Sequence, residues 1–281
     1  MQRFNLHCHT NFGGVFDGNN TAEEMISTYE QKGFETVGIS NHCIYSKFFE
    51  TAEKQKTDNN VDISAMYFHN IDKLIDVHKR SFESIDEAAS KHKIKVLKGF
   101  EMDFFMSKDW IKVFDKITKE LKPDYIIGAT HFLRNKDESF LFNLYYYKQM
   151  RSEYKKEINE FVKNYWINVI EAVKSGCFNF IAHPDYCCQF GLAVGDEWDD
   201  YKNNFIETLY KTKTPCEINT KCLRTTGNPS PTWNLVNEMI KKEIPLLISD
   251  DAHRIEDAGA KFDEVEYKLK ELGCSKRFIS L

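Results

Sequence analysis

Six of the nine histidines in this chain follow short apolar runs that have the length and composition of β-strands. These runs, with the residues after them, read FNLHCHT, TVGISNH, YIIGATH, FNFIAHPD and LLISDDAH. Two further runs, KVLKGFEMDF and PCEINT, carry Glu101, Asp103, Glu217 and Asn219 in the same way. Imidazoles and carboxylates are typical ligands of divalent metals, and no serine or cysteine is suitably placed as a nucleophile. The pattern predicts a multinuclear metal centre where the strand ends converge.

The first pair of candidate ligands, His7 and His9, is separated by one residue on an extended segment. Side chains alternate along a strand, so both imidazoles point to one face, where they can bind one metal, and Cys8 points away. An isolated H-x-H pair is a weak signal, because such residues are often unrelated polar groups. Here it opens a series with shared strand-end placement, which favours a common site. In contrast, His69, His78 and His92 lie far from any strand end, and we expect them to be solvated.

Strand and helix patterns alternate along the whole chain. We expect strands at residues 4–10, 36–40, 95–100, 125–129, 178–182, 216–219 and 245–249, and helices at about 21–32, 64–93, 109–121, 149–174, 197–212, 231–242 and 257–272. Thr21 and Glu24 form a capping box at the first helix. Strands separated by helices predict parallel pairing. An open sheet would concentrate its site at one switch point, so polar residues after all seven strands favour a closed barrel, one domain over residues 1–281.

The bulk composition restricts the class of protein. A net charge of −5 without a basic run argues against a dedicated nucleic-acid binder. No apolar stretch approaches the thickness of a bilayer, and the first residues show no apolar signal region, so we expect a cytoplasmic protein without membrane contact. The eight cysteines form no C-x-x-C pair and are predicted to be reduced thiols. The composition leaves the oligomeric state open.

The ordered motifs resemble those of the PHP (polymerase and histidinol phosphatase) superfamily. The matching pieces are HCHT at 7–10, NH at 41–42, GFEMDF at 99–104, GATHFL at 128–133, IAHPDY at 181–186, EINTKCLR at 217–224 and SDDAHR at 249–254. They span nearly the whole chain in the order of the family, and three of them (GFEMDF, EINTKCLR and SDDAHR) resemble the histidinol-phosphate phosphatase branch. The resemblance implies a distorted, TIM-like barrel of seven strands with two or three divalent metal ions, which can be Zn, Mn or Fe.

The resemblance also implies a ligand set. His7, His9, Glu101 and Asp251 would hold one metal, Glu101 would bridge to a second that His131 and His183 also hold, and His42 and His253 would hold a third. Asp17 is the ionisable candidate in the loop after H-x-H, with a plain turn residue as the alternative. Strand alternation directs Asp251 and His253 to one face and Asp250 elsewhere. Asn41 stands where many relatives have Asp; it can hydrogen-bond but brings no charge.

Candidates for binding the phosphate of a substrate are Arg224 and Arg254, with Lys221 and Arg134 behind them, since guanidinium groups match phosphate oxygens. Each alone is more typical of a surface charge. Asp103 and Asp185 lie next to predicted ligands, where they can orient a ligand or transfer a proton. Asp185 and Asp17 are candidate acids for the leaving group. The catalytic set is therefore predicted as Glu101, Asp251, His253 and Asp185.

The function implied by the resemblance is hydrolysis of L-histidinol phosphate to histidinol and phosphate, a step of histidine biosynthesis. A hydroxide that bridges two metals would attack phosphorus in line. The nearest alternative is a phosphatase of another small phosphorylated substrate: a phosphotyrosine, a sugar phosphate or a nucleotide. A non-catalytic metal-binding relative is the alternative from another class. Aromatic-rich segments at 45–49, 140–147 and 186–198 are expected to rim the site.

Overall fold

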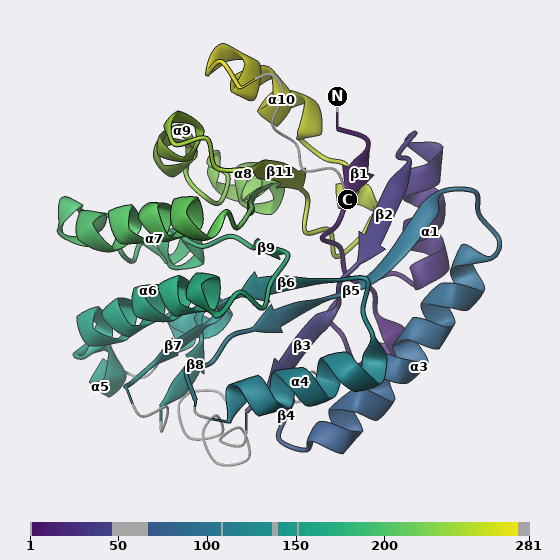
Figure 1. The fold of residues 1–281 in the computed structure, drawn as a ribbon, viewed down its shortest axis with the longest axis horizontal. Helices are drawn as coiled ribbons and strands as arrows, with labels where there is room; N and C mark the ends of the chain where they lie inside the picture. Colours follow the sequence, from purple (N-terminus) through teal and green to yellow (C-terminus); the bar gives the residue numbers. More distant parts are fainter. Residues whose placement is uncertain (1, 47–66, 108, 137–139, 151, 275–281) are drawn as a thin grey trace.

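Seven parallel strands of the computed structural model lie side by side and nearly close into a barrel (Figure 1). In spatial order they are β1 (Phe4–Asn5), β2 (Thr36–Ile39), β5 (Lys95–Asp103), β6 (Tyr125–Ala129), β9 (Phe180–Ile181), β10 (Cys216–Asn219) and β11 (Leu246–Ser249). The structure describes residues 2–46, 67–107, 109–136, 140–150 and 152–274. Spatial order follows chain order, as the alternation of strands and helices predicts.

The barrel closes at a seam between its first and last strands, which share no regular ladder. A single bridge joins Cys8 to Ala252, where His9 N donates to Ala252 O at 2.9 Å. The side chain of Gln2 completes the seam, because its amide donates to Ile248 O at 2.6 Å and accepts from Ile248 N at 2.9 Å. The expectation of a distorted seven-stranded α/β barrel is confirmed.

Helices cover the outside of the barrel (Figure 1). They are α1 (Ala22–Gln31), α3 (Ile71–Ala89), α4 (Trp110–Leu121), α6 (Ile158–Ser175), α7 (Asp199–Thr212), α9 (Trp233–Lys241) and α10 (Phe262–Glu271). The capping box expected at α1 is present: Glu24 N donates to Thr21 Oγ1 at 3.3 Å, and Thr21 N donates to Glu24 Oε2 at 2.8 Å. No helix in the described part of the chain is long and apolar enough to cross a membrane.

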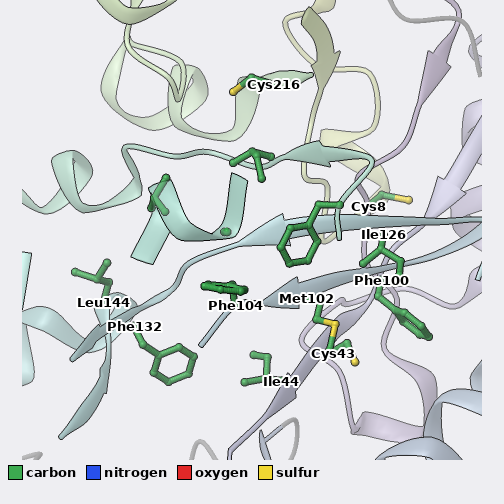
Figure 2. Packing of buried hydrophobic residues seen from close by; sticks show 14 of the residues in the cluster. Cys8, Cys43, Ile44, Phe100, Met102, Phe104, Ile126, Phe132, Leu144 and Cys216 are labelled. Atoms are coloured by element: carbon green, nitrogen blue, oxygen red, sulfur yellow. The ribbon is translucent and has the colours of Figure 1, made fainter. Parts of the chain in front are cut away.

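Alternation along the strands divides the apolar residues into two clusters. One fills the barrel, with Leu6, Tyr125, Ile127, Ala129, Phe180, Ala182 and Leu247. The other lies between strands and helices, and Figure 2 shows Phe100, Met102 and Ile126 among its members. Tyr125 blocks the interior and requires glycine beside it, since a Cβ on Gly99 would lie 2.4 Å from Tyr125 Cζ. With Phe100 and Met102 facing outward, Glu101 must face inward.

Several elements differ from the sequence prediction. The single helix expected over 149–174 is interrupted after a short α5 (Ser152–Lys155), so that α6 begins only at Ile158, and a 3-10 helix (Leu144–Gln149) precedes both. Four short strands were not expected: β3 (His42–Tyr45), β4 (Tyr67–Phe68), and the hairpin of β7 (Phe132–Arg134) with β8 (Leu141–Asn143). A short helix, α8 (Thr220–Thr226), follows β10 directly. All of these additions except α5 and β4 adjoin predicted site residues.

Two of the three histidines expected to be solvated are not. His78 lies on the buried stripe of α3 between Leu74 and Phe82 and is 1% exposed, so that prediction is wrong. Its ring packs 4.7 Å from the ring of Phe100, between centroids. His92 is half-buried, with Nδ1 2.8 Å from Glu30 Oε2, whereas His69 is exposed as expected. The eight cysteines are free thiols, as predicted.

Candidate metal centre

The nine residues predicted as metal ligands all lie together at the carboxyl pole of the barrel. Their potential ligand atoms form four overlapping groups, each within 4.8 Å: His9, Asp17, His42 and His253; His7, His183 and Asp251; His7, His9 and Glu101; and His42, Glu101 and His131. Seven of these residues follow or end the barrel strands, and His42 lies on β3, paired with Glu101 on β5. The structure therefore assembles the predicted set, and its division among individual metals stays a prediction.

Glu101 occupies the centre of this cluster. It is fully buried, because strand alternation directs it into the barrel from β5. Its Oε2 lies 3.3 Å from His7 Nε2, 3.4 Å from His9 Nε2 and 2.9 Å from His42 Nδ1, and its Oε1 lies 3.3 Å from His131 Nε2 and 2.7 Å from His183 Nε2. A carboxylate that faces imidazoles with both oxygens has the geometry of a bridging ligand.

Asp251 provides a second carboxylate on the other side of the H-x-H pair. Its Oδ1 lies 3.3 Å from His9 Nε2 and 3.4 Å from His253 Nδ1. Asp250 points away, as expected, and its carboxylate accepts from Tyr29 Oη at 2.8 Å. Asp251 has φ 49° and His183 has φ 22°, in the left-handed region that residues other than glycine seldom adopt. Such strain concentrates at functional sites, where the surrounding structure enforces it.

Asp17 lies on the solvent side of the cluster, and its side chain is 37% exposed. Its Oδ2 is 3.1 Å from His253 Nε2 and 3.5 Å from His42 Nε2. The sequence left open whether Asp17 is a ligand or only a turn residue. This geometry places it with the two histidines of the predicted third metal, which favours the ligand interpretation.

Two buried carboxylates behind the cluster orient its histidines. Glu217 Oε2 is 2.8 Å from His7 Nδ1, and Asp103 Oδ2 is 2.8 Å from His131 Nδ1. An ionised carboxylate only accepts, so each Nδ1 carries the proton and each Nε2 lone pair is free to bind a metal. Asp103 Oδ1 also accepts from His131 N at 2.8 Å, and Glu217 Oε1 accepts from His183 N at 3.0 Å. Both carboxylates therefore fix the orientation of metal ligands.

The H-x-H segment is held by its neighbours on both faces. Asn41 Oδ1 accepts from Thr10 N at 2.8 Å, which fixes the backbone directly after His9. Cys8 points the other way, with Sγ 3.4 Å from Gly38 O, as the alternation predicted. Asn41 therefore supports the ligand segment by neutral hydrogen bonds rather than by charge.

Charges within the cluster compensate one another when no metal lies between them. Burial opposes ionisation of His7, but Glu217 and Glu101 outweigh burial and hold the pKa of His7 well above its usual value. Burial likewise opposes ionisation of Glu101, yet His7 and His42 hold its pKa well below the usual value. Burial, with His253 and His42, lowers the pKa of His9 to about 3, so His9 is neutral and able to bind a metal. Glu101 is therefore ionised, as a carboxylate must be to bind a metal.

The residues present fit a metal centre on hydrogen-bond grounds as well. Among the described residues, several buried atoms of this cluster have no hydrogen-bond partner: His7 Nε2, both ring nitrogens of His9, His42 Nδ1, Glu101 Oε2 and His183 Nδ1. Buried polar atoms without partners are costly and rare. Metal coordination would satisfy most of them at once. The donor set of nitrogen and carboxylate oxygen suits Zn, Mn and Fe alike.

The predicted phosphate-binding arginines lie beside the cluster and make other contacts. Arg224 Nη1 donates to Asp250 O at 3.0 Å, and Arg224 Nε is 3.5 Å from Asp257 Oδ1. Arg254 Nε donates to Asp257 Oδ2 at 2.8 Å, and its side chain is 58% exposed. Arg134 is buried on β7. The phosphate-binding role of these arginines stays a prediction.

The carboxylate of Asp185 also forms hydrogen bonds with neighbouring residues. Its carboxylate accepts from Ser230 Oγ and, at 2.8 Å, from Thr232 N, which attaches the segment before α9 to the barrel pole. Burial raises the pKa of Asp185, which favours the protonated form that an acid needs. Its role as the acid for a leaving group stays a prediction.

Two site residues received too little weight in the sequence prediction. Lys221, ranked behind the arginines, reaches into the cluster, with Nζ 3.2 Å from Asp251 Oδ1 and 3.3 Å from His253 Nδ1. Glu217 was identified only as a polar residue near a strand end. Its inward orientation follows from alternation with Cys216 and Ile218, which pack outward, so the signal was available. No strand pattern reports where Lys221 points, because it lies on α8.

An aromatic wall flanks the cluster at His131 and His183. The ring of Tyr186 lies 5.4 Å from the ring of His131 and 5.2 Å from that of His183, between centroids. Phe190 packs 5.2 Å from Tyr186 and 6.5 Å from Tyr147, so segments 140–147 and 186–198 meet here, as expected for a rim. Tyr45 ends β3, while residues 47–49 of the first aromatic segment lie outside the described residues.

The chain is similar to known proteins in sequence. A model of the PHP domain matches residues 5–221, a range that contains every predicted ligand except Asp251 and His253. A Deinococcus radiodurans protein named "Probable histidinol-phosphatase" is 24% identical over 183 residues, which is 64% of this chain. The alignment spans 66% of that relative, just under two thirds of its length.

Solved structures share the fold. A structure from Listeria monocytogenes superposes with a TM-score of 0.72 at 16% identity, covering 93% of this chain and 99% of its own. A histidinol phosphate phosphatase from Lactococcus lactis, solved with zinc, L-histidinol and phosphate, superposes with a TM-score of 0.67 at 16% identity. The match covers 100% of this chain and 95% of that one. A chain from the structures of metal-dependent tyrosine phosphatases from Bacillus subtilis and Streptococcus pneumoniae superposes with a TM-score of 0.51 at 13% identity. The match covers 97% of this chain and 88% of that one. At these sequence identities, the structural similarity shows that the chains share the barrel fold and nothing further.

Proposed function

Because this chain belongs to the PHP domain family, we propose that it is a metal-dependent phosphomonoesterase that hydrolyses L-histidinol phosphate to histidinol and phosphate. The observation that carries the proposal is Glu101, whose two oxygens face five imidazoles inside a cluster of nine ligand-type residues. A carboxylate in this position would bridge two divalent metals, so we expect two or three metals per chain.

The metals would supply the chemistry that side chains of this site lack. When bound, they lower the pKa of a water and withdraw charge from the phosphoryl group. Glu101 and Asp251 provide the negative charge that holds them, and Glu217 and Asp103 keep His7 and His131 in the tautomer that binds a metal. Zinc is present in the Lactococcus lactis structure, which supports zinc as one candidate beside Mn and Fe.

Lys221 is the cation best placed to attract the phosphate of the substrate. Its Nζ is 3.2 Å from Asp251 Oδ1, and 40% of its side chain is exposed, so the ammonium lies between the cluster and solvent. Arg224 and Arg254 stand behind it, and each would have to leave Asp257 to reach the substrate. We assign the first contact with phosphate to Lys221 and a supporting electrostatic role to Arg224.

The remainder of the substrate would lie against the aromatic wall. Tyr186 and Phe190 offer flat apolar faces next to His131 and His183, where a planar imidazole ring can stack. A phosphotyrosine ring could use the same wall, and the tyrosine phosphatases that share the fold keep this second candidate open. The names of the Deinococcus radiodurans and Lactococcus lactis relatives support histidinol phosphate as the first choice.

Phosphate release from a panel of substrates, with Mn- and Zn-loaded protein compared, tests the proposal. The panel contains L-histidinol phosphate, phosphotyrosine, a sugar phosphate, a nucleotide and p-nitrophenyl phosphate. Histidinol phosphate should give the highest kcat/KM. If it is hydrolysed no faster than p-nitrophenyl phosphate, the specific substrate is wrong. A metal-loaded protein that is inert towards the whole panel would instead support a non-catalytic metal-binding relative.

A further inference from the structure

We infer that Asp250 is a positioning residue of the metal centre, because it holds the segment that carries the predicted ligands Asp251 and His253. The inference rests on the metal centre of the proposed function and concerns a residue that is not itself a ligand. Asp250 is fully buried. Since Ile248 of β11 packs outward, alternation directs Asp250 into the apolar layer between strands and helices. A carboxylate in such a layer is costly unless hydrogen bonds satisfy it.

Hydrogen-bond donors from separate parts of the fold converge on this carboxylate. Tyr29 Oη of α1 donates to both of its oxygens at 2.8 Å. Asn5 Nδ2 of β1, across the seam of the barrel, donates to Oδ1 at 3.0 Å. Two main-chain groups complete the set: Ala252 N donates to Oδ1 at 3.1 Å, and Gly259 N donates to Oδ2 at 2.6 Å. The first strand, the first helix and the segment after β11 are therefore joined at Asp250.

The contact with Ala252 N bears on the backbone conformation of a predicted ligand. An aspartate that accepts from the main-chain N–H two residues later forms an Asx turn, and Asp251 is the residue enclosed by this turn. Asp251 has φ 49°, in the left-handed region that residues other than glycine seldom adopt. The turn is a local reason why Asp251 keeps this φ and presents Oδ1 3.3 Å from His9 Nε2.

The contact with Gly259 N holds the same segment at its other end. The chain passes through His253 and returns to the carboxylate of Asp250 at Gly259. Directly after that point, Ala260 O accepts from Thr220 Oγ1 at 2.8 Å, which ties the returning chain to α8. The two oxygens of Asp250 thus fix both ends of a loop that contains His253, and Asp250 acts on the metal ligands through the backbone.

Asp250→Asn breaks these contacts while it keeps the shape of the side chain. Asparagine has a single acceptor oxygen, and its NH2 group faces a main-chain donor in either orientation, because Ala252 N lies at Oδ1 and Gly259 N at Oδ2. One end of the loop is therefore released without a cavity. Loss of a group that orients metal ligands typically lowers metal affinity, so we expect Co²⁺ to bind the folded variant at least about tenfold more weakly.

Equilibrium dialysis of metal-free protein against Co²⁺, with the absorption spectrum of the bound ion recorded, tests this inference. The spectrum reports the arrangement of the ligands, which a residue that only stabilises the fold would leave unchanged. Asp250→Asn should bind Co²⁺ more weakly than wild type and change its spectrum. Urea unfolding of the metal-free proteins measures stability separately. Asp200→Asn is the matched control, because Asp200 is exposed on α7, and it should bind Co²⁺ as wild type does.

Wild-type affinity and spectrum in folded Asp250→Asn protein would overturn the inference, even if that protein were less stable. Asp250→Ser replaces the asparagine variant if the latter does not fold. Its hydroxyl can accept from Ala252 N but is too short to serve Gly259 N as well, so the same outcomes apply to it. No substrate enters the measurement. Wild-type protein that binds Co²⁺ but hydrolyses no phosphoester would overturn the proposed function and leave this inference to be decided by the affinities.

Discussion

Glu217→Gln tests how the cluster is held in place. In the wild type, Glu217 Oε2 accepts from His7 Nδ1 at 2.8 Å and from Ser249 Oγ at 2.6 Å. Oε1 accepts from His183 N at 3.0 Å and from Asn219 Nδ2 at 2.8 Å. Glutamine has nearly the same shape but a single acceptor oxygen, so in either orientation its NH2 group faces a donor. The substitution therefore introduces a donor–donor conflict without a cavity.

The structure decides where that conflict falls. His183 N is a backbone donor, and Asn219 Nδ2 is fixed because Oδ1 of the same amide accepts from Lys221 N. The oxygen of Gln will stay on that side, and its NH2 will face His7 Nδ1. His7 must then carry its proton on Nε2, which blocks metal binding. If His7 returns to the tautomer that binds a metal, its Nδ1–H faces the NH2 group of the glutamine, and two buried donors then oppose each other at a cost of about 1–3 kcal/mol. We expect a roughly 10–100-fold loss of metal affinity.

Competition with a chromophoric chelator measures this loss, with circular dichroism to show that the fold is intact. Glu207→Gln is the control, because Glu207 pairs with Lys242 on the surface and should leave metal affinity unchanged. Wild-type metal affinity in folded Glu217→Gln protein would refute the argument that Glu217 sets the tautomer of His7.

Three further substitutions examine other parts of the molecule. Glu101→Gln removes the bridging charge and should lose turnover and at least one metal per chain by elemental analysis; near-wild-type activity would make Glu101 merely structural. The His78→Leu protein should keep its metals, but its stability, measured by urea unfolding, should depend less on pH than that of the wild type. Burial lowers the pKa of His78 from 6.5 to about 3, so the unfolded state takes up a proton first. Wild-type stability should therefore fall by up to about 1.4 kcal/mol per pH unit below pH 6.5, and an equal slope in both proteins would contradict this. Arg224→Ala should reduce kcat/KM equally for histidinol phosphate and p-nitrophenyl phosphate, because both share the phosphoryl group; a loss of about 2–3 kcal/mol in transition-state stabilisation would show direct contact with phosphate instead of the supporting electrostatic role.

The barrel and its ligands were predictable because both depend on alternation along strands. Glu101 must face the barrel once Phe100 and Met102 face the helices, and the carboxyl ends of parallel strands meet at one pole. The assignment of the strand-end histidines as metal ligands came from the family resemblance, and His42 lies on β3, which the strand pattern did not predict. His78 could have been placed in the core as well, since it lies four residues from both Leu74 and Phe82 on one apolar stripe.

Other features depend on tertiary contacts that have no local signal. No glycine or proline marks the break between α5 and α6 in the helix expected over 149–174. Lys221 resembles any surface lysine in sequence, and its place in the cluster depends on where β10 passes into α8. Asp257, which engages both Arg224 and Arg254, was not identified because no periodicity reports ion pairs between distant residues.

The seam of the barrel has a consequence for when the centre can assemble. His7 and His9 stand on one side of it and Asp251 and His253 on the other, and hydrogen bonds of Gln2, Asn5 and His9 join the two sides. Any metal held across this boundary is a cross-link between the beginning and the end of the chain, and its binding free energy adds to closure of the barrel. A growing chain on the ribosome lacks the far half of that cross-link until about residue 253 has emerged, so uptake of a metal held across the seam belongs to the last stage of folding.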